Sequence, residues 1–545
     1  MTRRRTQSVT AILATIAAGA LLLTGCAAAG SSASVTGKRV SGGTIVYGHE
    51  QEPPCVTGGW IQEAYLSRQV LDSLVSQTAK GTIVPWLATG WTVSNDQKVW
   101  TFTLKKGVKF TDGTPFNAQA VVDNFTYWLA GGNGTVSAYL KDYYASSVAR
   151  DDSTFQLTLT KPYSPLLSVL SQGYFGIQSP TALKRSAAVN CEDPIGTGPF
   201  IVGKWARGQS ITFTRNPDYN SAPANAKHQG PAYVDTLVWK FLADPTTRYG
   251  SLTSGETNVI YDVPSVDWQA AKQSYSVQQY ITPGRPVTLS LNTVHGPFTD
   301  VNVRRALAYS LDRKAIVKSA FNGSVPEEGN GSVSRSTPGY DASVANDYTY
   351  DPAKAKALLS AAGWKASGTS KVREKDGQKL QITIPYGLGS IITPEGSTAL
   401  QNLQQQAQAV GFSVKLVPVQ QSAFFSGKYS TPTAYDASPG YWTSPTAGIL
   451  YINYKQNLPD SPNGNNTTFY NNPTLENLII QANSTLDTTQ QDALYAKAQQ
   501  LISDQATAIG LYDQTTSLAV QAGLKDVWIE ASQGEPVFSD AYFVK

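Results

Sequence analysis

The side chains that most enzymes use for hydrolysis or redox chemistry are scarce in this chain of 545 residues. It has three histidines (His49, His228 and His295) and three cysteines (Cys26, Cys55 and Cys191), and neither set has the spacing of a zinc site. The nucleophile-elbow pattern G-x-S-x-G, the zinc-protease pattern H-E-x-x-H and the Walker A phosphate-binding pattern do not occur. We therefore expect a protein that is not an enzyme and needs neither a metal nor a cofactor.

The composition instead suits the capture of a solute in a cleft. Tryptophan (11), tyrosine (28) and phenylalanine (17) make up 10% of the residues, and these side chains bind ligands by stacking and by neutral hydrogen bonds. The net charge is +4, of which Arg3, Arg4 and Arg5 supply three units, so the remaining chain is nearly neutral. This balance argues against a nucleic-acid partner, and the length predicts two to four domains or lobes.

The N-terminus predicts export followed by lipid anchoring. An apolar stretch, Thr10 to Leu23, follows the basic residues Arg3, Arg4 and Arg5 and is shorter than a typical membrane-spanning helix. The following Leu23-Thr24-Gly25-Cys26 resembles the bacterial lipobox, which implies a signal peptide at 1–25 and a diacylated Cys26 as the first mature residue. The Gly/Ser/Ala-rich residues 26–42 predict a flexible tether that holds an extracytoplasmic body at the membrane. A simple secretory peptide cut nearby is the alternative.

Two cysteines remain after the lipidation site, Cys55 and Cys191. Because an exported protein folds in an oxidising compartment, an otherwise cysteine-free body with two thiols suggests one disulfide. Two buried thiols are the other possibility.

The rest of the chain alternates short β-rich runs with capped helices. Asp244-Pro245 and Asp351-Pro352 each combine an N-cap with proline at the first helical position, and so predict helix starts. The stretch from Asp300 to about Gly323 predicts one long helix, on which Arg304 and Arg305 are interpreted as surface ion-pair partners. The β-α-β alternation after Val294 indicates an α/β lobe with a mixed sheet.

Several blocks, in order, resemble the extracytoplasmic solute-binding proteins that serve oligopeptide-type ABC importers (bacterial solute-binding protein family 5). They are GTIVPWLATGWTVSNDQKVWTFTLKKGVKFTDGTPFNAQAVVDNF, PIGTGPFIVGKW with TRNPDY, SLTSGETNVIYDV, LSLNTVHGPFTDVNVRRALAYSLDR and DPAKAKALLSAAGW. Each block is weak alone, but together they span most of the chain from Gly43 to Lys545.

The resemblance implies an α/β fold of the two-lobe periplasmic-binding-protein type, with a hinge and an extra β-rich subdomain in the first lobe. The predicted division is 43–85 (lobe 1, first part), 86–194 (β-rich subdomain), 195–286 (lobe 1, second part), 287–512 (lobe 2) and 513–545 (lobe 1, C-terminal return). Two crossover segments, near Pro283–Asn292 and near Leu511–Thr515, are expected to act as the hinge.

The segment from Tyr435 to Tyr451 is the candidate for specificity in lobe 2. In peptide-binding relatives an aromatic residue here is followed by an Asp that pairs with the ammonium group of the ligand, whereas Trp442 is followed by Thr443, Ser444 and Pro445. Ser444 stands where the Asp is expected and brings no charge. We expect Trp442, Tyr441 and Ser444 to contact the ligand, with Asp436 or an acid of the first lobe as a substitute for the missing carboxylate. Core packing is the alternative for Trp442 and Tyr441.

In the first lobe, Glu50, Gln51 and Tyr261 follow predicted strands. Strand ends of open α/β sheets face the ligand cleft, so these side chains, together with Asp262, are further candidates for ligand contact. A solvated loop is the alternative for Glu50 and Gln51.

These expectations describe a monomeric, lipid-anchored receptor that captures a small solute and delivers it to ABC permease subunits in the membrane. A short peptide is the leading ligand class, with an oligosaccharide or another polar solute as the alternative. A ligand sensor would share the fold, and a secreted hydrolase would need paired carboxylates that sequence alone does not reveal.

Overall fold

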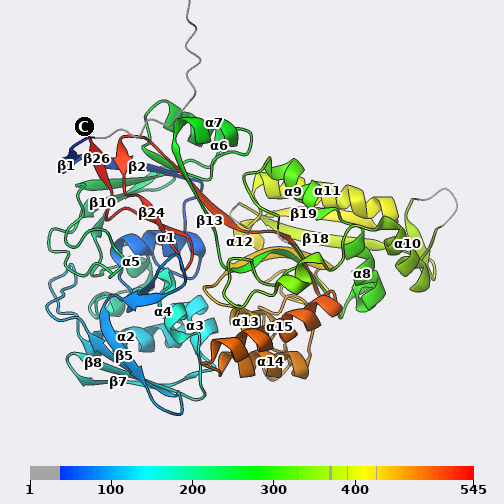
Figure 1. The fold of residues 1–545 in the computed structure, drawn as a ribbon, viewed down its shortest axis with the longest axis horizontal. Helices are drawn as coiled ribbons and strands as arrows, with labels where there is room; N and C mark the ends of the chain where they lie inside the picture. The colour runs from blue at the N-terminus through cyan, green and yellow to red at the C-terminus, as the bar shows by residue number, and fades with distance from the viewer. Residues whose placement is uncertain (1–36, 328, 367–370, 390, 425) are drawn as a thin grey trace, which may run out of the picture.

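The computed structural model describes residues 37–545 except 328, 367–370, 390 and 425, so Cys26 and most of the tether lie outside the described residues. Two lobes lie side by side, and the β-rich subdomain extends the first of them, drawn at the left of Figure 1. The α/β two-lobe architecture expected from the sequence is confirmed.

The first lobe is built on a seven-stranded sheet with the order β13-β22-β12-β2-β11-β10-β9. Its strands are β2 (Thr44–His49), β9 (Phe200–Ala206), β10 (Ser210–Arg215), β11 (Thr236–Phe241), β12 (Val259–Tyr261), β13 (Ser276–Ile281) and β22 (Thr515–Val520). Because β2 pairs in parallel with β11 and β12, the residues after His49 and Tyr261 emerge at the same edge. Helices α1 (Ile61–Val70), α6 (Pro245–Thr253) and α7 (Trp268–Ser274) belong to this lobe.

A four-stranded antiparallel sheet forms the β-rich subdomain, in the order β5-β6-β8-β7. Its strands are β5 (Ala88–Val93), β6 (Val99–Leu104), β7 (Tyr144–Asp151) and β8 (Thr154–Leu159), and its helices are α2 (Ala118–Tyr127), α3 (Gly134–Leu140), α4 (Leu166–Leu170) and α5 (Ala187–Glu192). Trp100, Phe102 and Leu104 alternate along β6 and are buried, as the alternating sequence predicts for a sheet covered on one face. The short pair β3 (Val75–Gln77) and β4 (Ile83–Pro85) leads into it.

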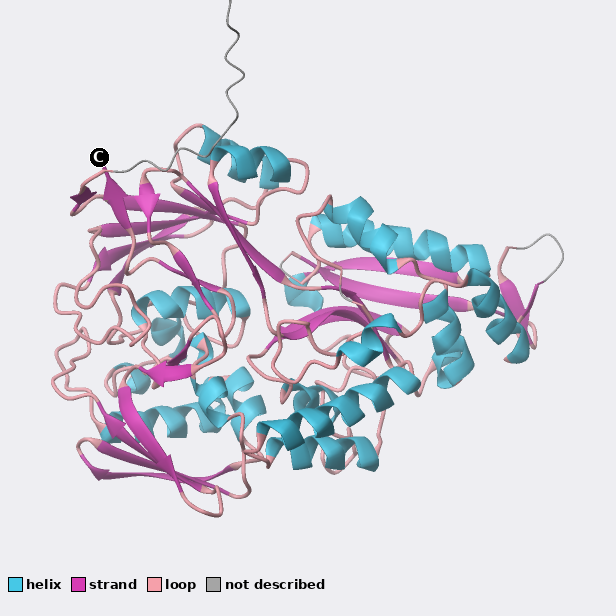
Figure 2. Ribbon diagram, viewed as in Figure 1, coloured by secondary structure: helices cyan, strands magenta, loops and turns pink. Residues whose placement is uncertain are grey.

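The second lobe has β14 (Gly284–Leu291) between β20 (Ala437–Thr443) and β21 (Ala508–Tyr512), with the parallel pair β18 (Gln381–Leu388) and β19 (Ser413–Gln420) beside them (Figure 2). Its helices are α8 (Val301–Tyr309), α9 (Arg313–Phe321), α10 (Pro352–Ala361), α11 (Pro394–Val410), α12 (Gln421–Phe424), α13 (Ile449–Tyr454), α14 (Pro473–Asn483) and α15 (Thr488–Asp504). The short strands β15 (Lys365–Ala366), β16 (Arg373–Lys375) and β17 (Gln378–Lys379) form a small sheet of their own.

The predicted helix caps are confirmed, but the single long helix after Asp300 is wrong. Asp244 and Asp351 accept hydrogen bonds from the backbone N–H groups of Thr247 (2.7 Å) and Lys354 (2.8 Å). The expected long helix is instead divided at Ser310–Asp312, because the Asp312 side chain caps a second helix, α9.

Arg304 is also not a surface residue. It is buried and donates to the backbone carbonyls of Phe298 (2.7 Å) and Gln505 (2.8 Å), so it ties α8 to the end of α15. Arg305 likewise donates to a carbonyl, that of Asp504. Within the part of the chain that the structure describes, neither arginine makes the expected surface ion pair.

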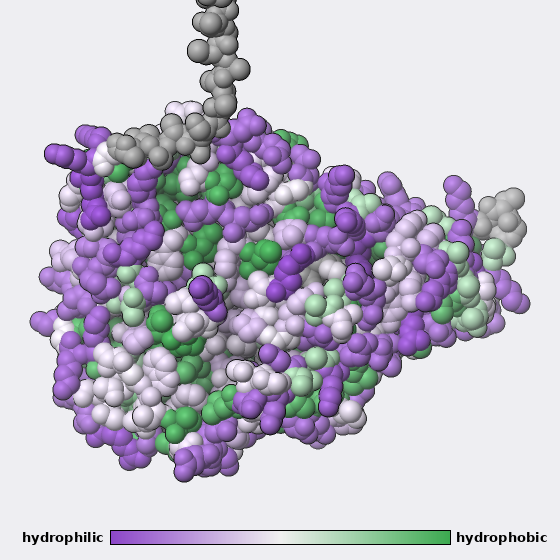
Figure 3. All heavy atoms as spheres, in the orientation of Figure 1, coloured by the Kyte–Doolittle hydropathy of each residue, from purple (hydrophilic) through white to green (hydrophobic). Residues whose placement is uncertain are grey.

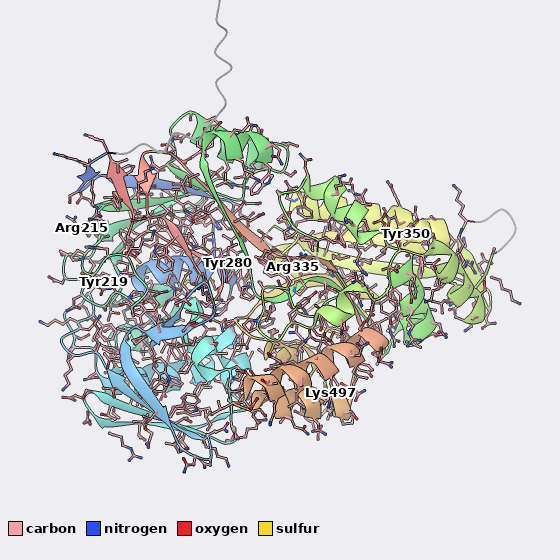
Figure 4. The ribbon with its side chains drawn as sticks, viewed as in Figure 1. Arg215, Tyr219, Tyr280, Arg335, Tyr350 and Lys497 are labelled. Atoms are coloured by element: carbon pink, nitrogen blue, oxygen red, sulfur yellow. A yellow bond between two sulfur atoms is a disulfide. The ribbon has the colours of Figure 1, made fainter. Side chains whose placement is uncertain are left out.

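Two crossovers connect the lobes, at 282–283 between β13 and β14 and at 513–514 between β21 and β22. Figure 4 shows Tyr280 and Arg335 near this junction. The range Pro283–Asn292 expected for the first crossover is wrong for most of its length, because Gly284–Leu291 pairs with β20 and β21 inside the second lobe. The tail then forms the short sheets of β1 (Arg39–Val40), β23 (Leu524–Lys525) and β26 (Tyr542–Val544), and of β24 (Trp528–Glu530) and β25 (Glu535–Val537).

The β-rich subdomain also touches the second lobe far from the crossovers, where one hydrophobic core includes Phe125 and Phe155 of the subdomain and Ile479 and Tyr495 of α14 and α15. A hydrogen bond crosses the same contact surface: the side-chain amide of Asn483 donates to the Tyr143 hydroxyl (3.0 Å). The two lobes are therefore in contact away from the crossovers as well as at them. No helix in the described part of the chain is long and apolar enough to cross a membrane.

Candidate functional site

Three neighbouring cavities lie along the contact between the two lobes. The disulfide-side cavity (about 540 Å³) is lined by Cys55, Thr57, Gly58, Gly59, Trp60, Glu63, Tyr127, Trp128, Asn133, Gly134, Thr135, Ala138, Gln178, Ala187, Asn190, Cys191, Trp442 and Asn465. The central cavity (about 830 Å³) is lined by Glu50, Gln51, Glu52, Pro53, Pro54, Trp60, Arg207, Ala243, Leu388, Gly389, Ile392, Pro394, Gln420, Gln421 and Ser422.

The hinge-side cavity is much smaller, about 30 Å³, and is lined by Glu50, Tyr261, Asp262, Val263, Ser265, Phe321, Ser324, Val325, Thr393, Glu395, Tyr512, Asp513, Gln514 and Thr515. Trp60 belongs to the walls of both larger cavities, and Glu50 belongs to the walls of the central and hinge-side cavities. The three cavities are thus neighbours, and together their walls, which come from both lobes, make up the candidate cleft.

The loop after β2 supplies the first-lobe wall of this cleft. A disulfide between Cys55 and Cys191 joins the loop to α5, with a Cα–Cα distance of 4.8 Å. Glu52 is held by the indole N–H of Trp205 (2.8 Å) and the backbone N–H of Gly208 (2.9 Å), and it lies 3.6 Å from Arg207. These contacts fix the loop that carries Glu50 and Gln51 into the cleft.

Glu50 and Gln51 differ in how their polar groups are satisfied. The Glu50 carboxylate forms no hydrogen bond with the described residues, and burial first, then the charge of Glu395, raises its pKa against the opposing effect of Arg248. The side-chain carbonyl oxygen of Gln51 is buried without a hydrogen-bond partner among the described residues. Both groups are therefore free to bind a polar ligand.

His49, just before them, is fully enclosed beneath the cleft. Burial lowers the pKa of its imidazole to about 3, so this ring is neutral at physiological pH. Its Nδ1 lies 3.3 Å from the backbone N–H of Gln51, which makes the ring a support for the loop.

At the end of β12, Tyr261 and Asp262 form the neighbouring wall. Asp262 has a positive φ of 53°, a left-handed conformation that aspartate tolerates better than most residues, and this turns the chain at the strand end. Burial and the nearby Glu50 raise the pKa of Asp262 to about 7, although Arg248 opposes them. Tyr261 packs its ring on His49, with centroids 4.7 Å apart.

Arg248 is close to these acids but does not neutralise them by hydrogen bonding. Its Nε donates to the carbonyl of Tyr261 (2.8 Å), and its Nη atoms donate to the carbonyls of Leu242 (2.7 Å) and Asp262 (3.1 Å). The carboxylate of Asp262 is 3.9 Å from the guanidinium, beyond hydrogen-bond distance.

The predicted specificity segment of the second lobe divides into residues that line the cleft and residues that do not. Trp442 is half-buried, lines the disulfide-side cavity and donates its indole N–H to the Tyr139 hydroxyl (3.2 Å) of the β-rich subdomain. Tyr441 is half-buried, packs against the hydrophobic core of the second lobe and lines none of the three cavities.

Ser444 and Asp436 also lie away from the cavity walls. Ser444 is fully buried and its hydroxyl donates to the carbonyl of Thr446 (3.2 Å), while its N–H donates to the carbonyl of Pro283 (2.9 Å) at the first crossover. The Asp436 carboxylate accepts the backbone N–H of Thr383 (2.7 Å) and so joins β18 to β20. The structure therefore gives both side chains partners within the protein.

Several residues of the cleft did not stand out in the sequence, chiefly Trp60, Glu395 and Tyr512. Glu395 had a local signal, because Thr393-Pro394-Glu395 is a helix start with an acid in the first turn, and the Thr393 side chain does cap α11. Nothing local connects this helix start with the strand end at Asp262, more than 130 positions earlier.

Comparison with known proteins identifies the family. A family model described as "bacterial extracellular solute-binding proteins, family 5 Middle" matches residues 82–476. The probable D,D-dipeptide-binding periplasmic protein of Escherichia coli (strain K12) is 30% identical over 453 residues, which cover 81% of each chain. The glutathione-binding protein of Shigella flexneri is 28% identical over 462 residues, 82% of this chain and 84% of that protein.

Solved structures show the same fold. The oligopeptide-binding protein AppA of Bacillus subtilis, in complex with a nonapeptide, has a TM-score of 0.78 at 22% identity and covers 93% of this chain and 100% of its own. NikA of Brucella suis, in complex with Fe(III)-EDTA, has a TM-score of 0.79 at 24% identity and covers 92% of this chain and 100% of its own. The chain belongs to the bacterial extracellular solute-binding proteins of family 5.

Proposed function

We propose that this protein is the solute-binding component of an ABC importer and that it binds a peptide-like solute between its lobes. The observation that carries this proposal is the pair of adjacent interlobe cavities, of about 540 and 830 Å³, that share the wall residue Trp60. Cavities of this size hold small organic ligands, and a solute that occupies both must be extended, as a short peptide is. The relatives named for dipeptide and glutathione binding support the same ligand class.

The proposed mechanism is ligand-dependent closure about the crossovers at 282–283 and 513–514. A solute that touches both lobes has its full set of contacts only in the closed form, so binding shifts the population toward closure. Permease subunits in the membrane then recognise the closed protein. The division into lobe 1 (43–85, 195–286 and 513–545), its β-rich subdomain (86–194) and lobe 2 (287–512) belongs to this proposal.

We further propose that a lipid on Cys26 anchors the body to the outer face of the membrane after removal of residues 1–25. Cys26→Ser should move the protein from the membrane fraction to the soluble fraction and leave ligand affinity unchanged, because the tether separates the anchor from the cleft. Retention of the variant in the membrane fraction would show that another element anchors the protein.

A defined library of tetrapeptides, offered to the purified protein and read by native mass spectrometry, tests the ligand class. We expect retention of a subset of peptides and a decrease in the radius of gyration in solution scattering when they bind. A maltooligosaccharide series of similar length is the matched comparison. Retention of the saccharides and not the peptides would contradict the proposal.

A further inference from the structure

The second lobe encloses an arginine that has no acidic partner in the described part of the chain. The face of the molecule in Figure 3 is hydrophilic over most of its area, so the charges there are hydrated. Arg285 instead lies in β14 next to β20 and α13, where its Nη1 donates to the side-chain oxygen of Asn453 (2.7 Å). Its Nε is buried and has no hydrogen-bond partner among the described residues. A buried N–H group without a partner costs free energy, and a further acceptor would remove this cost.

The positive charge of Arg285 is uncompensated as well. Burial lowers the pKa of its guanidinium to about 10, and the groups that oppose this shift are the hydroxyls of Tyr454 and Tyr435. The guanidinium is therefore charged at neutral pH, and no described carboxylate contributes to its surroundings. Arg335 of the same lobe differs, since it donates to Asp513 (2.6 Å). An anion supplied from outside the chain would offset the cost of enclosing Arg285.

The accessible surface of β14 and β20 is confined to the neighbourhood of Arg285. Every other residue of β14 is buried, and along β20 only Gly440, Tyr441 and Trp442 keep accessible surface. Arg285 pairs with Trp442 in the antiparallel register, so their side chains leave the sheet on the same face. Trp442 lines the disulfide-side cavity of about 540 Å³. Arg285 thus lies beside the wall of a cavity that the proposed solute occupies.

The free edge of the guanidinium suits a planar anion. Because Nη1 is bonded to Asn453, the edge formed by Nε and Nη2 is left without a partner among the described residues. The N–H groups of such an edge are parallel and match the two oxygens of a carboxylate. Gly440 leaves room beside this edge, where an added Cβ atom would be 3.4 Å from Nη2. A carboxylate can therefore approach where any other residue would place a side chain.

We propose that Arg285 binds a carboxylate group of the solute and that Trp442 packs against the adjoining part of the ligand. This inference rests on the proposed solute-binding function and deepens it, because it names a charged group that the ligand must carry. The carboxylate supplies the negative charge that the described chain does not place beside Arg285. Since the enclosed cation is compensated only in the complex, Arg285 should raise ligand affinity without stabilising the free protein.

The test uses three tetrapeptide libraries in competition for the full-length protein, read by native mass spectrometry. The first has free C-termini, the second is C-amidated and lacks aspartate and glutamate, and the third is C-amidated with one aspartate at each position in turn. We expect a preference of about tenfold or more for peptides with a carboxylate over the second library. The third library distinguishes a side-chain carboxylate from the α-carboxylate.

Three variants test the residues of the site. Arg285→Met keeps the length of the side chain and should reduce the preference by about tenfold to hundredfold. Arg285→Lys keeps the charge but loses the paired N–H groups, so it should reduce the preference by less. Gly440→Ala should reduce it because the methyl group takes the space beside Nη2. The control is Arg215→Gln in the first lobe (Figure 4), which removes an arginine paired with Asp235 (2.9 Å) away from the three cavities and should keep the preference.

Thermal unfolding without ligand separates a binding role of Arg285 from a structural one. An arginine that only holds α13 through Asn453 would give a lower melting temperature in Arg285→Met and an unchanged preference. We expect the reverse, a melting temperature that is unchanged or higher together with a lost preference. If Arg285→Met lowers both, Gly440→Ala decides, because it keeps the bond to Asn453: a reduced preference supports the site, and an unchanged preference overturns it.

Equal capture of peptides with and without a carboxylate by the wild type would overturn the inference while leaving the peptide-binding function intact. An unchanged preference in Arg285→Met would overturn it as well. Capture of no library would instead contradict the proposed ligand class. In that case propionate is the probe: an increase in melting temperature that Arg285→Met abolishes supports the carboxylate site, and no response overturns it.

Discussion

Asp142 joins the β-rich subdomain to the second lobe, and its removal tests whether that contact helps to hold the lobes closed. Its carboxylate accepts from the Lys455 ammonium (2.7 Å) and from the Tyr451 hydroxyl (2.9 Å), both at or beside α13. Burial alone would raise the pKa of Asp142, but these two donors lower it, so the group is ionised at neutral pH. Asp142→Asn keeps the shape and removes the charge.

The expected magnitude follows from the exposure of the pair. The side chains of Lys455 and Asp142 are 25% and 32% exposed, so the ion pair contributes about 0.5–1 kcal/mol. Weakening of the charge-assisted hydrogen bond from Tyr451 brings the total to about 1–2 kcal/mol. In the proposed mechanism the free protein is open, so the loss of this contact energy destabilises only the closed, ligand-bound state. Ligand affinity should therefore weaken by about fivefold to thirtyfold.

Calorimetry with one peptide identified by the capture experiment measures this change, and solution scattering measures the closed fraction. The matched control is Glu256→Gln, which breaks the Lys240–Glu256 ion pair within the first lobe and should leave affinity unchanged. Equal affinities of wild type and Asp142→Asn, with equal closed fractions, would refute the idea that this contact contributes to closure.

Three further predictions concern the walls of the cleft. Replacing Cys55 and Cys191 by serine should destabilise the protein by up to about 5 kcal/mol, because the disulfide closes a loop of 136 positions; an unchanged melting temperature would contradict this. The pKa of Asp262 is about 7 without ligand, and a bound cation would favour its ionised form. Affinity for a peptide with a free ammonium group should therefore fall as the pH drops below about 7, and binding at pH 7 should release protons. Calorimetry in two buffers of different ionisation enthalpy measures the release, and Asp262→Asn should abolish it. Trp442→Ala should weaken binding by about 1–3 kcal/mol, whereas Trp91→Ala, away from the three cavities, should not.

The pH prediction depends on every charged group near Asp262. Those groups are Glu50 after β2, Arg248 on α6, Glu395 on α11 and Asp513 at the second crossover. Arg248 opposes the elevation of the Asp262 pKa, and Asp513 is compensated by Arg335. Glu50 and Glu395 both raise the pKa of Asp262, so replacement of either by glutamine should lower it, with the larger effect at Glu50.

Local sequence signals predicted the secondary structure where the physical cause was local. The caps at Asp244 and Asp351 need only a side chain and a backbone N–H three residues away, and both were predicted correctly. The break at Asp312 was missed because apolar periodicity continues through it, and the cap that causes it is a single side chain. Arg304 was misplaced because its partners, carbonyls at Phe298 and Gln505, are set by packing between helices.

The candidate site was predictable in parts and not as a whole. Glu50, Gln51 and Tyr261 line the cavities, in agreement with the general rule that places strand ends at the cleft, and their contact with a ligand stays a prediction. Glu395 and Tyr512 were not found, since their proximity to Asp262 depends on the chain returning through the second lobe and the crossover. A cavity whose walls come from both lobes has no signature in any one segment.

Ser444 gives the sharpest contrast between the sequence and the structure. From the sequence, Ser444→Asp should restore the acid that peptide-binding relatives have at this place. In the structure Ser444 is fully buried, its hydroxyl donates to the Thr446 carbonyl and its N–H donates to the carbonyl of Pro283. A carboxylate here would lose its water and meet the Thr446 carbonyl oxygen, while the neighbouring Tyr139 hydroxyl supplies a donor but no charge.

We therefore expect Ser444→Asp to destabilise the protein by several kcal/mol, and Ser444→Ala, which loses one hydrogen bond, by only about 1 kcal/mol. Since burial raises the pKa of such a carboxyl above its unfolded value, the loss should grow as pH rises from 4 to 8, and thermal unfolding across this range measures it. A variant with an unchanged melting temperature and a new preference for free N-termini would show that position 444 faces the ligand after all. A destabilised Ser444→Asp variant without that preference would agree with the buried position of Ser444 in the structure.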